Sequence, residues 1–210
     1  MMEIELIIFD FDGTIYDLSD VNSHIYNMEV NYLSYKLKIG EMESKQLLNM
    51  NHIYPIVKSD SESATSFFER LGFDKVEWLE YKEKHFDESL IKKENSIDLK
   101  FLIEIKQKYK VALVTTNSTK VINRILLHLN IDHSMFDLIV CNDGLINGYN
   151  KKSVFQSISK QFDVPFEKMV SVGDRYKTDI IPMLELGGRG VLIHSPKDIN
   201  ILLNNVFSST

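Results

Sequence analysis

The stretch IIFDFDGTIYD, Ile7–Asp17, places two aspartates, Asp10 and Asp12, two residues apart directly behind an apolar run. The run Leu6–Phe9 has no polar alternation, which is typical of a strand buried on both faces of a parallel sheet. The FDGT that follows is compatible with a turn in which an aspartate acts as a cap. It is also compatible with a pair of working carboxylates, and the rest of the chain decides between these interpretations.

Four further apolar runs have the same character. They are VALV at 111–114, LIV at 138–140, MVSV at 169–172 and GVLI at 190–193. Between the runs, apolar residues recur at helical spacing, as in Val121, Ile122, Ile125, Leu126 and Leu129. This alternation over about residues 97–207 predicts an α/β fold, a Rossmann-like parallel sheet with helices on both faces.

The first interval between strands is much longer than the others. About a hundred residues separate the first two strands, whereas a parallel crossover needs only about a dozen. A structureless loop of that length is not found in compact domains, so the excess is expected to be structured. Its apolar residues form a helical stripe at Val21, Ile25, Met28, Tyr32 and Leu33. We therefore expect residues 18–96 to form an inserted helical domain, and residues 1–17 and 97–210 to form the α/β domain.

Composition and charge exclude several classes of protein. The net charge is −6 and no long Lys/Arg block is present, which argues against nucleic acid as the main partner. No apolar run reaches the roughly 18 residues that span a bilayer, and the acidic N-terminus does not resemble a signal peptide. The single cysteine, Cys141, has no internal disulfide partner, as in a reducing compartment. We expect a soluble cytoplasmic protein with no membrane partner, and the sequence leaves its oligomeric state, monomer or dimer, open.

Polar clusters stand next to the predicted strands. Asp10 and Asp12 follow the first strand, and the later clusters are Thr115–Ser118, the pair Lys151-Lys152 and Gly173–Asp179. The carboxyl ends of strands in an open α/β sheet line the ligand crevice, so these groups are expected to converge at one edge. Each cluster alone is compatible with a turn, a helix cap or a solvated helix face. Their joint occurrence in this order favours a functional site.

This constellation resembles the haloacid dehalogenase superfamily. The stretch DFDGT is similar to its first motif, Thr116-Asn117 to its second, a lysine at a helix start to its third and GDRYKTD to its fourth. The family places a helical cap between the first motif and the second strand, so residues 18–96 resemble that cap. The resemblance implies a hydrolase of the phosphatase branch, acting on a small phosphorylated metabolite.

The resemblance also implies the catalytic roles. Asp10 is the expected nucleophile, which attacks phosphorus and forms an aspartyl-phosphate. Asp12 is the expected general acid, which protonates the leaving oxygen and later activates water as a base. Lys151 is expected to neutralise charge between the nucleophile and the phosphate.

A metal ion and a phosphate site complete the expectation. The resemblance implies Mg²⁺ held by the Asp10 carboxylate, the Asp12 backbone carbonyl and the Asp174 carboxylate, with Asp179 close by. Thr116 and Asn117 are expected to hold phosphate oxygens at the start of a helix, where the dipole favours an anion.

Two departures from the family pattern leave choices open. The third motif usually has a Lys-Pro pair, but NKKSVF has no proline, so Lys151 and Lys152 compete. We favour Lys151 because it leaves Val154 and Phe155 in register with the helix core. In the second motif the threonine is doubled, and we favour Thr116 because the family has a hydroxyl residue immediately before the asparagine.

Several functions of the superfamily remain to be compared. Dehalogenases lack an aspartate at the position of Asp12, because a halide leaving group needs no proton, so phosphate chemistry is favoured. A hexose-phosphate mutase is the main alternative, but its histidine at the start of the cap would lie two residues before His24. A nucleoside-monophosphate 5′-nucleotidase is a weaker alternative. Tyr16 is a candidate contact for the part of the substrate that is not phosphate, and phosphoglycolate, a sugar phosphate and a nucleotide all remain open as substrates.

Overall fold

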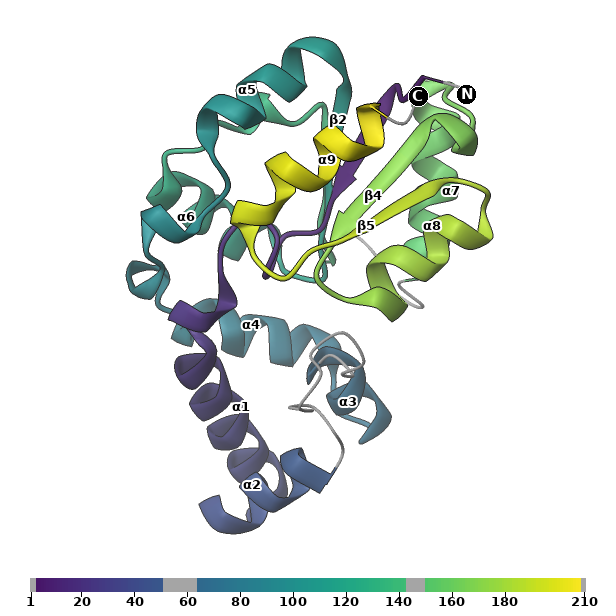
Figure 1. Ribbon diagram of the computed structural model, residues 1–210. Helices are drawn as coiled ribbons and strands as arrows, with labels where there is room; N and C mark the ends of the chain where they lie inside the picture. Colours follow the sequence, from purple (N-terminus) through teal and green to yellow (C-terminus); the bar gives the residue numbers. More distant parts are fainter. Residues whose placement is uncertain (1–2, 51–63, 143–149, 209–210) are drawn as a thin grey trace.

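The computed structural model describes residues 3–50, 64–142 and 150–208 (Figure 1). All five predicted strands form, within one residue of the expected limits: β1 (Leu6–Phe9), β2 (Lys110–Val114), β3 (Leu138–Val140), β4 (Met169–Gly173) and β5 (Arg189–Leu192). They pair in parallel in the order β3-β2-β1-β4-β5. β1 is therefore the central strand, and the residues that follow it lie between the ends of β2 and β4.

Helices cover both faces of this sheet, as the sequence predicts. They are α5 (Leu99–Lys108), α6 (Thr119–Leu129), α7 (Lys151–Phe162), α8 (Ile181–Glu185) and α9 (Ile199–Ser208). Alternate residues of β1 enter different cores, because successive side chains of a strand point to opposite faces. Ile7 and Phe9 pack in the core that includes α5, α6 and α9. Leu6 and Ile8 pack in the core that includes α7 and α8.

The long segment between β1 and α5 is helical. It contains α1 (Asn22–Leu37), α2 (Glu41–Met50), α3 (Ala64–Arg70) and α4 (Lys75–His85), which lie together at one end of the sheet (Figure 1). An aromatic cluster joins α1, α3 and α4, with the Tyr32 ring centroid 4.9 Å from that of Trp78 and 5.1 Å from that of Phe68. Such offset and tilted ring pairs stabilise a core beyond the area they bury.

The chain leaves and re-enters the α/β part at adjacent points. The backbone N–H of Asp17 donates to the Asn95 carbonyl oxygen at 2.9 Å, and the N–H of Ile97 donates to the Ile15 carbonyl oxygen at 2.8 Å. These bonds fix the two connections side by side, and the division of the chain at residues 18 and 96 stays a prediction.

Arg124 of α6 also holds the helical segment against the α/β part. Its guanidinium donates to the carbonyl oxygens of Glu83 at 2.7 Å and Phe86 at 2.6 Å, and it pairs with the Glu88 carboxylate. This pairing lowers the pKa of Glu88. The end of α4 is thereby tied to α6, whose first turn follows β2.

Within the described residues, no helix has both the length and the apolar character that crossing a bilayer requires.

Candidate active site

The nucleophile expected at the end of β1 lies in a compact charged cluster. The Lys151 Nζ is 2.5 Å from Asp10 Oδ1 and 2.7 Å from Asp179 Oδ1. Carboxylate oxygens of Asp10, Asp174 and Asp179 all lie within 4.8 Å of one another. The structure thus brings together residues from the ends of β1 and β4 and from the start of α7.

The start of α7 explains why Lys151, rather than its neighbour, enters this cluster. The Asn150 side chain caps the helix by accepting from the Lys152 N–H at 2.8 Å, which is a preferred arrangement for a first turn. Lys151 then shares the buried side of α7 with Val154 and Phe155. Lys152 points outward and pairs with Glu185, which is 53% exposed.

Asp179 reaches the cluster because the chain after β4 folds back tightly. Gly173 ends β4, and a Cβ built there would lie 2.4 Å from the Asp179 Cβ, so only glycine allows this approach. The Asp179 carboxylate accepts from the Arg175 N–H and from the Thr178 hydroxyl, each at 2.9 Å. Both of its oxygens therefore have protein donors, in addition to Lys151.

The electrostatics of the cluster favour a divalent cation. Burial raises the pKa of Asp10 well above its ordinary value, against the lowering effect of Lys151, and the neighbouring carboxylates raise it further. Three carboxylates face one ammonium, which leaves an excess of two negative charges when all are ionised. Hard oxygen donors at this separation fit Mg²⁺, so the residues present are compatible with the expected ion.

Asp12 has a different environment from Asp10. The Tyr16 hydroxyl donates to Asp12 Oδ1 at 2.5 Å, and the Asn117 Nδ2 donates to Asp12 Oδ2 at 2.6 Å. Tyr16 is fully buried, so its hydroxyl bonds to Asp12 instead of lining an open entrance. Burial, followed by the nearby Asp12 carboxylate, raises the pKa of Tyr16 well above its ordinary value. Each oxygen of Asp12 is therefore held by a neutral donor.

The loop after β2 carries Thr115, Thr116 and Asn117, and it is Asn117 that contacts Asp12. Thr115 is buried and its Oγ1 accepts from the Asn117 N–H at 3.1 Å, so it shapes the turn. Thr116 is half-buried. The Asn117 carbonyl oxygen accepts from the Asn142 N–H at 2.9 Å, which fixes the loop to the end of β3.

Lys82 was not among the residues expected from the sequence. It lies in α4, and its Nζ donates to the Asn117 Oδ1. The sequence does contain one indication that Lys82 faces the interior. It is spaced four residues from both Trp78 and Phe86, which are buried. A lysine in an otherwise apolar helix stripe is therefore the only trace that the sequence carries.

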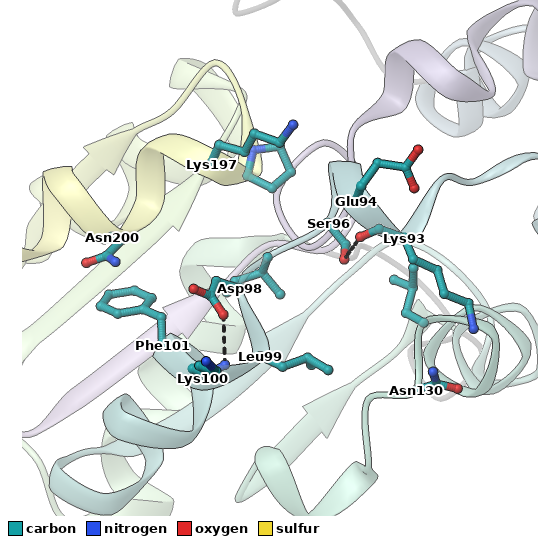
Figure 2. A pocket seen from close by; sticks show the side chains of 13 residues that line it. Lys93, Glu94, Ser96, Asp98, Leu99, Lys100, Phe101, Asn130, Lys197 and Asn200 are labelled. Atoms are coloured by element: carbon teal, nitrogen blue, oxygen red, sulfur yellow. Dashed lines mark hydrogen bonds between the residues drawn. The ribbon is translucent and has the colours of Figure 1, made fainter.

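A separate surface groove contains no comparable cluster. It has a volume of about 620 Å³, lies between the starts of α5 and α9, and shares no lining residue with the Asp10 cluster. Figure 2 shows the ammonium groups of Lys93 and Lys197 at opposite edges of the groove, pointing apart. Asp98 is used as the cap of α5, where it accepts from the Lys100 N–H at 2.9 Å. The polar groups do not converge, so we place the active site at the ends of the strands.

The sequence and the fold agree on the class of protein. Residues 7–187 match the family described as haloacid dehalogenase-like hydrolase. The chain belongs to this family of hydrolases, as the motifs predict, and it is an enzyme. A comparison with curated proteins gives no match.

Solved structures of the same fold come from several organisms. A HAD phosphatase from Thermococcus onnurineus has 19% identity and a TM-score of 0.62, over 95% of this chain and 98% of that one. A β-phosphoglucomutase from Clostridium difficile has 20% identity and a TM-score of 0.61, over 98% of each chain. The putative HAD-hydrolase YfnB from Bacillus subtilis, bound to magnesium, has 14% identity and a TM-score of 0.59, over 97% of this chain and all of that one. At these identities the likeness concerns the fold.

Proposed function

We propose that this hydrolase is a Mg²⁺-dependent phosphatase that releases inorganic phosphate from a small phosphorylated metabolite in the cytoplasm. The observation that carries the proposal is the separation of the two aspartates. Asp10 faces an ammonium and an acidic cluster, whereas Asp12 faces a hydroxyl and an amide. These environments suit a nucleophile and a proton-transfer group respectively.

In the first half-reaction an Asp10 oxygen attacks phosphorus, and the bond from phosphorus to the ester oxygen breaks. The departing oxygen takes a proton from Asp12, and the phosphoryl group remains on Asp10 as a mixed anhydride. In the second half-reaction water attacks phosphorus while Asp12 accepts its proton. The bond to Asp10 breaks, inorganic phosphate leaves and both aspartates regain their starting states.

The remaining residues neutralise the negative charge of the phosphoryl group during both steps. Lys151 lies against Asp10 and Asp179, where it can neutralise a phosphoryl oxygen as charge develops. Mg²⁺, when bound, would supply further charge neutralisation through the Asp10 and Asp174 carboxylates and the Asp12 carbonyl. Asp179 would support the ion from nearby, because its oxygens already accept protein hydrogen bonds. We assign Thr116 and Asn117 to the phosphate oxygens.

Residues 18–96 would act as a cap over this site, and residues 1–17 and 97–210 as the catalytic domain. Lys82 of α4 reaching Asn117 supports this division, because it brings the helical segment to the edge of the reacting groups. A cap of this kind excludes water while phosphoryl transfer proceeds.

A phosphomutase would have to protect its aspartyl-phosphate from water and return the phosphoryl group to a sugar. His24 offers little support for this alternative. Its Nε2 lies 2.9 Å from the His85 carbonyl oxygen and 3.1 Å from the Asp87 nitrogen, so main-chain groups occupy it. The phosphatase is therefore the better supported function.

The test is release of inorganic phosphate from 4-nitrophenyl phosphate and from a panel of phosphorylated metabolites that includes sugar phosphates and nucleoside monophosphates. Phosphate release should require Mg²⁺ and be lost in Asp10→Asn, whose melting temperature should remain close to that of the wild type. Activity that survives chelation, or survives Asp10→Asn, contradicts the proposal. An isomerised sugar phosphate without released phosphate would identify a mutase instead.

A further inference from the structure

Lys82 brings a positive charge from the helical segment to the edge of the active site. It is half-buried, on the side of α4 that also carries Trp78 and Leu79, and Phe86 directly after the helix is buried as well. Residues three and four apart share a helix face, so the packing of these apolar neighbours directs Lys82 towards the α/β part. Its Nζ donates to Asn117 Oδ1.

The Lys82 ammonium has a neutral partner. Other lysines around α4 have carboxylates: Lys36 pairs with Glu77 at 2.6 Å and Lys120 with Glu83 at 3.0 Å. In the described parts of the chain, no carboxylate lies within ion-pair distance of the Lys82 Nζ. An ammonium has three N–H donors and Asn117 accepts only one of them. Partial burial of a charge is unfavourable unless a counter-charge approaches, so this position is suited to an anion.

The location of Lys82 identifies which part of a substrate the anion belongs to. The Asn117 amide connects Lys82 on one side to Asp12 on the other. Asp12 is the group assigned to the leaving oxygen. The transferred phosphoryl group lies with Asp10 and Lys151 and is also assigned to Asn117, whose amide separates Lys82 from it. Only the Asn117 amide therefore separates Lys82 from Asp12, and so from the place expected for the leaving group of the substrate.

We propose that Lys82 is a specificity residue for phosphate monoesters whose leaving group carries a second anionic group, a carboxylate or a phosphate, within a few atoms of the ester oxygen. This inference rests on the proposed phosphatase function. Lys82 exchanges its hydrogen bond to Asn117 for one to the anion, and Asn117 Oδ1 is then available to a hydroxyl of the substrate or to water. A charge-assisted hydrogen bond of this kind contributes on the order of tenfold to a hundredfold in selectivity.

The experiment compares matched pairs of substrates that differ in one anionic group. Phosphoglycolate is paired with 2-hydroxyethyl phosphate, and propane-1,3-diol bisphosphate with 3-hydroxypropyl phosphate, so that carboxylate and phosphate are tested separately. The value of kcat/KM is measured for each member with the wild type, Lys82→Met and Lys82→Arg. Lys84→Met is the matched control, because Lys84 is an exposed lysine in the same turn of α4.

The wild type should prefer the anionic member of at least one pair. Lys82→Met should reduce that preference by about tenfold to a hundredfold, leave the neutral member within about threefold, and melt close to the wild type. Lys82→Arg should keep most of the preference and Lys84→Met all of it. A wild-type preference for both neutral members, or a preference unchanged in Lys82→Met, overturns the inference.

Two further outcomes separate this inference from the proposed function. If Lys82→Met lowers kcat/KM equally for both members of a pair, Lys82 contacts the transferred phosphoryl group, and its role in specificity is refuted. If the wild type releases no phosphate from 4-nitrophenyl phosphate in Mg²⁺, the phosphatase proposal itself fails. Phosphate release that is normal but indifferent to the leaving-group charge refutes only the role of Lys82.

Discussion

Replacing Lys151 with methionine tests the charged cluster, and Lys152→Met is an adjacent control. The Lys151 Nζ lies 2.5 Å and 2.7 Å from two carboxylate oxygens, and its side chain is only 8% exposed. At an effective dielectric of 20, the Coulomb attraction between the ammonium and each carboxylate is about 6 kcal/mol. The cost of removing the three charges from water offsets most of this attraction. Loss of one member of a buried ion pair therefore destabilises a protein by about 3–5 kcal/mol.

The control has the same charge change in a different environment. Lys152 and Glu185 are 38% and 53% exposed, so their 2.7 Å contact is screened by solvent. Such pairs contribute about 0–1 kcal/mol. In metal-free protein, thermal unfolding should show a melting temperature lowered by about 6–20 °C in Lys151→Met and by only a few degrees in Lys152→Met.

The same pair of variants tests catalysis. Lys151→Met should lower kcat in Mg²⁺ by about 10²–10³-fold, as removal of a transition-state charge stabiliser does, while Lys152→Met should remain within about twofold of the wild type. A larger loss of activity in Lys152→Met, or wild-type stability and kcat in Lys151→Met, would refute the reasoning from burial.

Asp12→Asn should lower kcat/KM by about 10²–10⁴-fold for an alkyl phosphate, whose leaving oxygen needs a proton. It should produce a burst of 4-nitrophenol from 4-nitrophenyl phosphate, because that leaving group needs none; equal losses of kcat/KM with both substrates contradict this role. The pKa of Asp10 is raised in the folded, metal-free protein. The stability that protonated Asp10 contributes is therefore fully present below the pKa of the unfolded state, and it is lost as pH rises through the raised pKa of the folded state. Mg²⁺ competes with that proton, so the increase in melting temperature from EDTA to Mg²⁺ should grow as pH rises from about 4 to 8; a constant increase argues against this competition. Gly13→Ala and Gly72→Ala should each cost about 1 kcal/mol, because φ is 79° and 81° at these positions. Thermal unfolding should show similar losses of stability in the two variants, and kcat should separate them, with activity lost only in Gly13→Ala.

The sheet was predictable because burial on both faces leaves a direct trace in the sequence. Residues such as Ile7 and Ile8 must both be apolar when helices cover both faces of β1, and both are buried. The face of α6 follows in the same way, because Val121, Ile122 and Ile125 can be buried together only on a helix. The helical insertion was predictable only in outline, from the excess length between β1 and β2. The packing of Tyr32 against Trp78 and Phe68 depends on how three helices meet.

The candidate site was predictable where a motif fixes the chain near a strand end. Asp10 and Asp174 follow β1 and β4, and the sheet order alone makes them neighbours. The choice of Lys151 over Lys152 followed from the helical register of Val154 and Phe155, and the structure places Lys151 beside Asp10. The assignment of Thr116 and Asn117 to phosphate stays a prediction.

The contacts of Tyr16 and Lys82 could not be predicted, because they depend on how the helical insertion sits over the sheet. The sequence suggested a residue at the mouth of the site, but Tyr16 is fully buried and its backbone forms an antiparallel bridge with Ser96. Lys82 lies 72 residues along the chain from Asp10 and approaches from α4. Local sequence contains no information about such an approach, beyond a lysine in an apolar stripe.

The spacing of Asp10 and Asp12 explains how one short stretch can supply two chemical roles. Residues two apart in an extended strand point to the same face, which would give both carboxylates the same surroundings. β1 ends at Phe9, however, and the N–H groups of Thr14 and Ile15 both donate to the Phe11 carbonyl oxygen, at 3.2 Å and 2.9 Å. The chain is therefore already turning at Asp12, and Gly13 continues the turn with φ 79°. This turn leaves Asp10 with the ammonium and the acids, and it carries Asp12 to the hydroxyl of Tyr16 and the amide of Asn117. The proposed nucleophile and the proposed proton-transfer group therefore have different neighbours only because the chain turns, so the turn after Phe11 is as necessary to the proposed chemistry as the aspartates themselves.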